Sequence, residues 1–138
     1  MSQGAMGNVR LTVRVDFGAG SALGPGKIRL LEAIGKTGSI SRAGRSLGMS
    51  YRRAWLLVDD MNRCFRSAVV ATQPGGARGG GAALTPFGWE LIENYRAIEA
   101  RATAAAKFHL QALEKSLRRQ RARPKKPLKT SIRAATAR

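Results

Sequence analysis

The stretch that decides the fold is TGSISRAGRSLGMSYRRAW, residues 37–55. It contains three glycines, four serines and four arginines, and no acidic residue. Small and apolar residues recur at helical spacing along its first half, at Ile40, Ala43, Gly44 and Leu47. Ser39 or Ser41 can cap such a helix, because a serine oxygen accepts an otherwise unpaired backbone N–H. The stretch therefore predicts a first helix about two turns long.

A glycine turn and a second helix follow directly. Gly48 suits the left-handed backbone conformation that ends a helix, and Ser50 is a good cap for the next one. The second helix has its core positions at Ala54, Val58, Met61 and Phe65. Gly44, four residues before Gly48, allows the two helices to cross closely. This spacing predicts a helix-turn-helix, whose second helix enters the major groove of DNA.

The charge balance also indicates a polyanionic partner. The chain has 25 Lys and Arg against 8 Asp and Glu, which gives a net charge of +17. No acid lies between Glu32 and Asp59, or between Arg63 and Trp89. We therefore expect double-stranded DNA as the partner. One cysteine, no apolar run of about 18 residues and no visible signal peptide predict a cytoplasmic, nucleoid-associated protein without membrane contact.

The flanking segments complete the predicted fold. Alternating apolar residues predict a half-buried strand over residues 9–17, followed by a loop and a helix from Pro25 that ends at Gly35. Residues 68–73 and 82–85 predict a β-hairpin around the glycine-rich PGGARGGG, and a hairpin in this place is a wing. Thr85 and Pro86 then open a long helix.

The fold class that follows is mostly α with a small β component, a winged helix-turn-helix. We expect residues 1–8 to be flexible, residues 9–85 to form the DNA-binding domain, and residues 118–138 to be a disordered basic tail. Residues 86–117 are predicted to form one helix about 48 Å long, which is too long to bury itself on so small a body. We interpret it as a dimerisation helix. Its predicted interface consists of Leu91, Tyr95, Ile98, Ala102 and Ala105.

The residues just described resemble a known family. GPGKIRLLEAIGKTGSISRAGRSLGMSYRRAWLLVDDMN (residues 24–62) and GGARGGGAALTPFGWELIENY (residues 75–95) are similar to the N-terminal domain of the molybdate-responsive ModE regulators. That domain is a winged helix related to the DNA-binding domain of LysR-type regulators. The resemblance covers about residues 9–117 and implies DNA binding by a helix-mediated homodimer. Full-length members also carry C-terminal molybdate-binding domains, which we expect this chain to lack, together with any small-molecule effector.

Three groups of residues are predicted to contact DNA. The second helix of the motif begins with Ser50, Tyr51, Arg52 and Arg53. An arginine there either donates two hydrogen bonds to guanine or binds a phosphate. Tyr51 either contacts a thymine methyl group or packs inward. Arg42 and Arg45 on the first helix either contact phosphate or are ordinary surface charges, and Trp55 either lies near the DNA or packs on the neighbouring helix. In the wing, the predicted contacts are Arg78, Gly79 and Gly80.

Other chemistries find little support in the sequence. GGARGGG lacks the lysine of a phosphate-binding loop and precedes a strand, not a helix. Cys64 and His109 each stand alone, so we expect no metal, no cofactor and no catalytic activity. The leading hypothesis is a homodimeric transcription regulator that binds a two-fold operator. The alternatives are an architectural DNA-binding protein with little sequence preference, and an adaptor whose long helix pairs with another protein.

Overall fold

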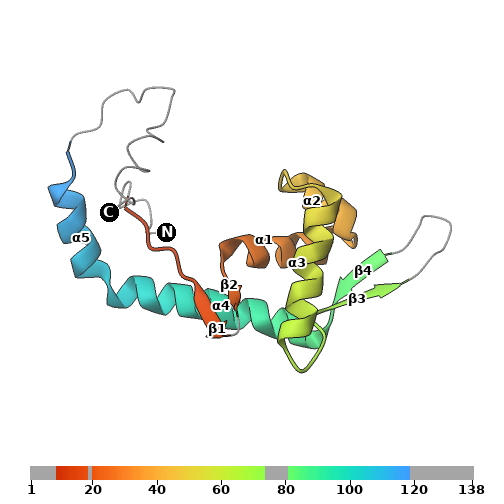
Figure 1. The fold of residues 1–138 in the computed structure, drawn as a ribbon. Helices are drawn as coiled ribbons and strands as arrows, with labels where there is room; N and C mark the ends of the chain where they lie inside the picture. Colours follow the sequence, from red (N-terminus) through yellow and green to blue (C-terminus); the bar gives the residue numbers. More distant parts are fainter. Residues whose placement is uncertain (1–8, 19, 74–80, 119–138) are drawn as a thin grey trace.

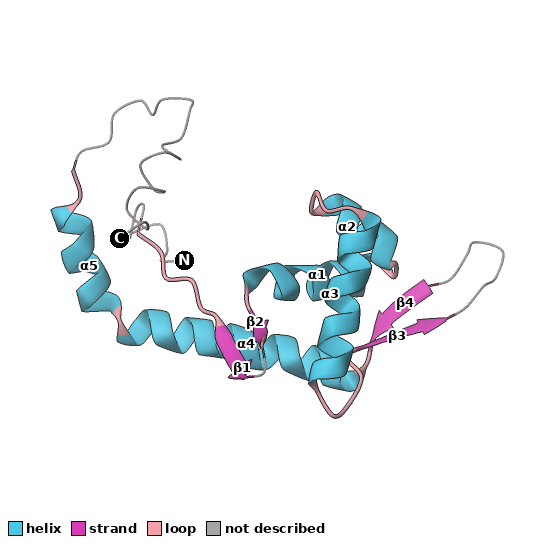
Figure 2. Cartoon of the chain, in the orientation of Figure 1, coloured by secondary structure: helices cyan, strands magenta, loops and turns pink. Residues whose placement is uncertain are grey.

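The computed structural model describes residues 9–18, 20–73 and 81–118. It is a mostly helical winged helix, as predicted, and it contains two small antiparallel sheets (Figure 2). The elements are β1 (Val15–Gly18), β2 (Ser21–Leu23), α1 (Pro25–Thr37), α2 (Ile40–Ser46), α3 (Tyr51–Cys64), β3 (Val70–Gln73), β4 (Gly81–Leu84), α4 (Pro86–Ala105) and α5 (Lys107–Ser116). Figure 1 shows α4 passing beneath the other helices, with the β3–β4 wing at one end and α5 at the other.

Three helices begin directly after a capping residue that the sequence predicted. The Oγ atom of Ser39 accepts a hydrogen bond from the backbone N–H of Arg42 at 3.0 Å, so Ser39 and not Ser41 caps α2. Ser50 caps α3 in the same way through the N–H of Arg53 at 3.1 Å. Thr85 caps α4, with Pro86 at the first helical position as predicted. Each cap satisfies a donor that the helix itself leaves unpaired.

The crossing of α2 and α3 depends on two glycines. A Cβ added to Gly44 would lie 2.8 Å from the Cβ of Ala54, so only glycine permits this approach. Gly48 has a φ of +74°, the left-handed conformation expected of the turn. Both predictions for the turn are confirmed. Leu47 departs from the predicted apolar face: it is 36% exposed, because α2 ends at Ser46 and Leu47 is already its C-cap.

The core lies between α1, α3, α4 and the base of the wing. The fully buried side chains of α1 are Ile28, Leu30, Leu31 and Ile34. The predicted core positions Ala54, Val58 and Met61 of α3 are buried, whereas Phe65, the C-cap of α3, is only half-buried. α1 also runs on past Gly35, where it was predicted to end, and stops at Gly38, which has a φ of +72°. Gly35 instead makes room for the Trp89 ring, which lies 2.8 Å from where a Cβ would be.

The N-terminal segment differs from the prediction. Residues 9–14 are not in a strand; only Val15–Gly18 is, and it pairs with β2, in residues predicted to be a loop. The burial alternates along residues 9–16, but Phe17 is 42% exposed, because it lies at an irregularity in the register between Asp16 and Gly18. A strand needs a hydrogen-bonded neighbour, and the short β2 provides one only for the end of the predicted strand.

The predicted hairpin of the wing is confirmed. Its strands β3 and β4 begin or end one or two residues away from the predicted bounds, and they pair in register from Val70 opposite Leu84 to Gln73 opposite Gly81.

The prediction of a single helix over 86–117 is wrong, because the helix breaks at Ala106 into α4 and α5 (Figure 1). The segment Ala104–Ala106 consists of the best helix former, and nothing in the local sequence explains the break. Among the described residues, no helix is long and apolar enough to span a membrane.

Candidate nucleic-acid interface

The first turn of α3 is presented to solvent. Tyr51, Arg52 and Arg53 are all exposed, and Tyr51 is 60% exposed. The other face of the helix is anchored in the core by Ala54 and Val58. The helix therefore has a rigid inner side and an accessible N-terminal end, as a groove-reading helix requires.

The electrostatics of this end are entirely positive. The arginines there are exposed and, within the described part of the chain, none forms an ion pair; they are Arg42, Arg45, Arg52 and Arg53. The first acid of α3 is Asp59, two turns further on, and it pairs with Arg63 at 3.1 Å. The partial positive charge of the helix N-terminus adds to the arginines. This end of the molecule is suited to an anionic partner.

Aromatic side chains lie beside these charges. Tyr51 points outward, and its ring packs edge-on against Trp55 with 6.3 Å between the centroids. Trp55 remains 38% exposed, so it is not buried against a neighbouring helix, and Leu56 is 54% exposed. The exposed face of α3 thus combines guanidinium groups with apolar surface, which can meet phosphates, base edges and thymine methyl groups.

The wing lies beside α3 and is tied to the body at its base (Figure 1). The backbone N–H of Ala82 in β4 donates to the carbonyl oxygen of Gly38 at 3.0 Å. On the β3 side, the side chain of Asn62 hydrogen-bonds to Val69 and Val70. Asn62 was not among the residues predicted from the sequence, because no spacing marks an asparagine whose partners are backbone groups seven and eight residues away.

Three predicted contacts, Arg78, Gly79 and Gly80, lie outside the described residues. The structure brings the other predicted DNA contacts together on α2 and at the start of α3. Those contacts are Arg42, Arg45, Ser50, Tyr51, Arg52 and Arg53. Their role in DNA binding stays a prediction.

The residues predicted for a dimer interface have different surroundings. Leu91 and Tyr95 pack inside their own chain, with exposed fractions of 7% and 1%, so they are not available to a second copy. Ile98 and Ala105 are exposed, and Ala102 is half-buried. The exposed apolar surface continues onto α5, beyond the predicted set, at Phe108, Leu113 and Leu117.

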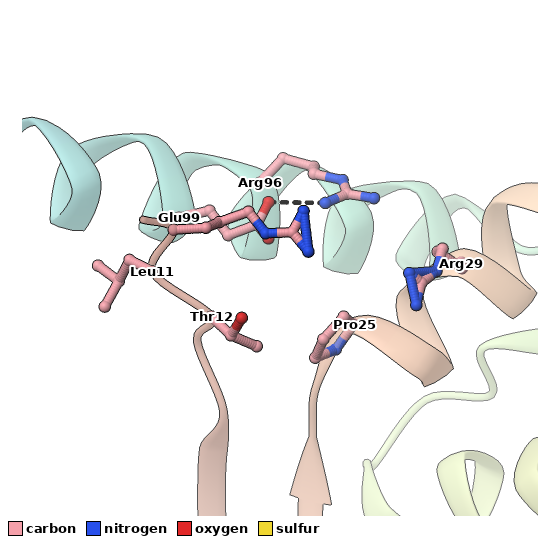
Figure 3. Close-up of a pocket in the computed structure, with 7 residues that line it drawn as sticks. Leu11, Thr12, Pro25, Arg29, Arg96 and Glu99 are labelled. Carbon is pink, nitrogen blue, oxygen red and sulfur yellow. Dashed lines mark hydrogen bonds and ion pairs between the residues drawn. The ribbon is translucent and has the colours of Figure 1, made fainter. Parts of the chain in front are cut away.

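A pocket of about 200 Å³ lies between the N-terminal segment, α1 and α4 (Figure 3). Its lining includes Arg10, Arg29 and Arg96, but Arg96 already has partners: it donates to Glu32 at 2.8 and 3.0 Å and to Glu99 at 2.6 Å. The hydrogen bond with Glu32 raises the pKa of Arg96 above its ordinary value. This ion-pair cluster joins α1 to α4, and we assign it a structural role.

The described residues contain no group of three or more side chains suited to hold a metal ion. Cys64 is a half-buried free thiol at the end of α3, and His109 is exposed on α5. Within the described ranges, neither belongs to a group of side chains that could hold a metal ion.

Comparison with known proteins gives sequence relatives, whereas no family model matches the chain. The chain is 50% identical over 98 residues to the molybdenum-pterin-binding protein MopB of Rhodobacter capsulatus. The aligned residues make up 71% of this chain and 35% of MopB. It is 42% identical over 85 residues to the molybdenum transport protein ModE of Azotobacter vinelandii, covering 62% and 32%. The match to the DNA-binding transcriptional dual regulator ModE of Escherichia coli K12 is 41% over 71 residues, covering 51% and 27%.

The chain spans about a third of the length of the first of these relatives. The matches confirm the resemblance inferred from the sequence motifs. Over the matched residues, the chain is a relative of the ModE and Mop proteins.

Proposed function

We propose that this protein is a transcription regulator that binds a two-fold operator in DNA as a homodimer. The observation that carries the proposal is the accessible N-terminal end of α3, where Arg52 and Arg53 are exposed and without ion pairs among the described residues. Relatives named as DNA-binding and transcriptional regulators support it. In this reading Arg52 or Arg53 forks onto a guanine, while Arg42 and Arg45 hold phosphates.

The homodimer rests on the apolar surface of the last two helices. Phe108 is 78% exposed, Leu113 is 60% exposed, and Ile98 adds an exposed apolar side chain on α4. Burying such side chains against a second copy removes apolar area from water, which favours association. A two-fold dimer then carries two copies of α3, and the operator repeats its half-site with the same symmetry.

Selection of bound duplexes from a random DNA pool, at near-physiological salt, tests this proposal. We expect an enriched inverted repeat whose half-sites lie about 34–36 Å apart, one turn of the double helix. An enriched single half-site would contradict the two-fold dimer. Tight binding without any enriched sequence would contradict the regulator itself.

That last outcome would favour the second candidate, an architectural protein that binds DNA by charge. The net charge of +17 is the observation in its favour. Each neutralised phosphate adds about 0.9 to the slope of log affinity against log salt. A steep slope that is equal for all sequences would identify charge-driven binding, whereas a regulator keeps a sequence preference over the same salt range.

Single arginine variants test the assignment of the reading residue. Arg52→Ala or Arg53→Ala should cost about 1–3 kcal/mol on the selected operator and relax the preference at one base pair. Arg29→Ala, an exposed arginine on α1 beside the pocket, is the matched control for loss of one positive charge. If all three variants weaken binding equally and on all sequences, neither Arg52 nor Arg53 reads a base.

A further inference from the structure

The side chain of Asn62 connects the candidate recognition helix to the wing. Its Oδ1 atom accepts hydrogen bonds from the backbone N–H groups of Val69 at 2.7 Å and Val70 at 3.1 Å. Its Nδ2 atom donates to the carbonyl oxygen of Val70 at 3.1 Å. Because the two N–H groups need an acceptor and the carbonyl needs a donor, the orientation of the amide is fixed by its partners.

This arrangement imitates a strand. Val70 opens β3 and pairs with Leu84 of β4 on one side. The amide of Asn62 bonds both the N–H and the C=O of the same residue, as a neighbouring strand would in a ladder. The amide group of α3 therefore covers the start of β3 and joins the helix to the hairpin by direct hydrogen bonds.

Other contacts hold the rest of the wing's base. Val69 and Val70 are buried, with exposed fractions of 0% and 3%. The carbonyl oxygen of Val69 accepts from the backbone N–H of Thr85 at 3.0 Å, and Ala82 bonds to Gly38. These contacts tie the wing to α1 and α4. Among the side-chain hydrogen bonds of the described residues, those of Asn62 are the ones that join α3 to the start of β3, so they are placed to help set the direction of the wing relative to α3.

We propose that Asn62 is a positioning residue, which sets the wing against α3 so that both contact one DNA duplex together. The inference rests on the proposed function, since it assigns a DNA contact to each of the two elements. The role assigned to Asn62 requires no direct contact between its side chain and DNA. Its loss should weaken the contact made by the wing and leave the contact made by α3 in the major groove.

The variants are Asn62→Ala, which removes all three hydrogen bonds, and Asn62→Asp, which keeps the acceptor and loses the donor to Val70. Asn94 is exposed on α4, so Asn94→Ala and Asn94→Asp are matched controls, the second also for the added negative charge. If Asn62→Ala does not fold, as judged by circular dichroism, Asn62→Asp is the variant that decides.

Two measurements on the full chain test the proposal. Hydrogen exchange of the free protein should show the amides of Val69 and Val70 exchanging about tenfold faster in Asn62→Ala, with α3 unchanged. Binding to the selected operator should weaken by about tenfold, comparable to one lost hydrogen bond to a charged group. Footprints should lose protection of the sugar–phosphate backbone at the flanks, while protection of guanine N7 in the major groove is kept.

The outcomes separate the two proposals. Wild-type affinity and footprint in a folded Asn62 variant would overturn the positioning role and leave the DNA-binding function intact. Equal loss of flank and major-groove protection would also overturn it, because Asn62 would then act on the whole fold. Wild-type protein that binds no DNA would refute the proposed function, and the positioning role with it.

Discussion

The helices α3 and α5 both expose large apolar side chains, but they are held in different ways. α3 exposes Tyr51, Trp55 and Leu56, while its other face is buried in the core through residues such as Met61. α5 exposes Phe108 and Leu113, its C-cap Leu117 is also exposed, and the helix has one buried residue, Leu110. Within the described residues its main contact is with α4, and Figure 1 shows it standing away from the body.

The exposed apolar surfaces of the two helices therefore suit different partners. On α3 it lies beside Arg52 and Arg53, which form no ion pair with any described residue, on a helix whose other face is held in the core. Such a surface suits a negatively charged partner that also has apolar groups. On α5 it lies on two sides of the helix, because at 3.6 residues per turn Leu113 lies on the side of Leu110 and Phe108 on the opposite side. A helix of 10 residues also gains little stability by itself. The stability of α5 should therefore depend on a second surface, and that of α3 should not.

The largest expected effect is a difference in stability between two leucine-to-alanine substitutions, one in the core and one on α5. Leu31→Ala, at a side chain with no exposure, should lower the free energy of unfolding by about 3 kcal/mol. Leu113→Ala, at a side chain that is 60% exposed, should change it by less than about 0.5 kcal/mol at low protein concentration. Urea unfolding measures both. Equal losses would show that α5 is part of the core.

A smaller effect is expected where α3 crosses α2. Gly44→Ala places a methyl group 2.8 Å from the Cβ of Ala54, and we expect a net loss of about 2 kcal/mol from the forced separation of the helices. Gly26→Ala in the first turn of α1 is the matched control, since an added Cβ there meets nothing within 4 Å. A Gly44→Ala protein as stable as the control would show that the crossing has room to adjust.

The sequence predicted the structure best where the role of a residue depends on its own backbone conformation or on groups a few residues away. Ser50 and Thr85 cap their helices, and Gly48 takes the left-handed turn, because each needs only groups within a few residues. The helix-turn-helix and the exposed arginines followed from these signals together with the spacing of the core residues.

The sequence was less informative where the partner is distant. Asn62 bonds to a strand beyond the end of its helix, and Gly35 serves the ring of Trp89, 54 positions further along the chain. Leu91 and Tyr95 were assigned to an interface because their spacing shows only that one face is apolar, not whether its own chain covers it. The break at Ala106 has no local signal at all.

Self-association should respond to α5 and not to α3. If the proposed homodimer forms through α5, Phe108→Ala should weaken it by about tenfold, which corresponds to about 1.4 kcal/mol, because the substitution removes a phenyl ring that is 78% exposed in the single chain. Leu56→Ala, which truncates an exposed side chain of α3, is the control and should leave the dimer constant unchanged. Sedimentation equilibrium measures both. Weakening by Leu56→Ala alone would place the interface on α3.

The smallest expected effect concerns Tyr95, which fixes the N-terminal segment to α4. Its hydroxyl donates to the carbonyl oxygen of Val13 at 2.6 Å, and burial, with a smaller effect of Glu99, raises the pKa of this phenol above 10.0. Tyr95→Phe should cost about 1 kcal/mol of stability at neutral pH.

The raised pKa also fixes the direction of a pH effect. Because the folded state favours the neutral phenol, the contribution of Tyr95 is fully present below pH 10 and is lost as the pH rises through the pKa of the folded protein. The stability difference between wild type and Tyr95→Phe, measured by urea unfolding, should therefore shrink above about pH 10. A constant difference up to about pH 11 would mean that the phenol of Tyr95 is not buried in solution as it is in the structure.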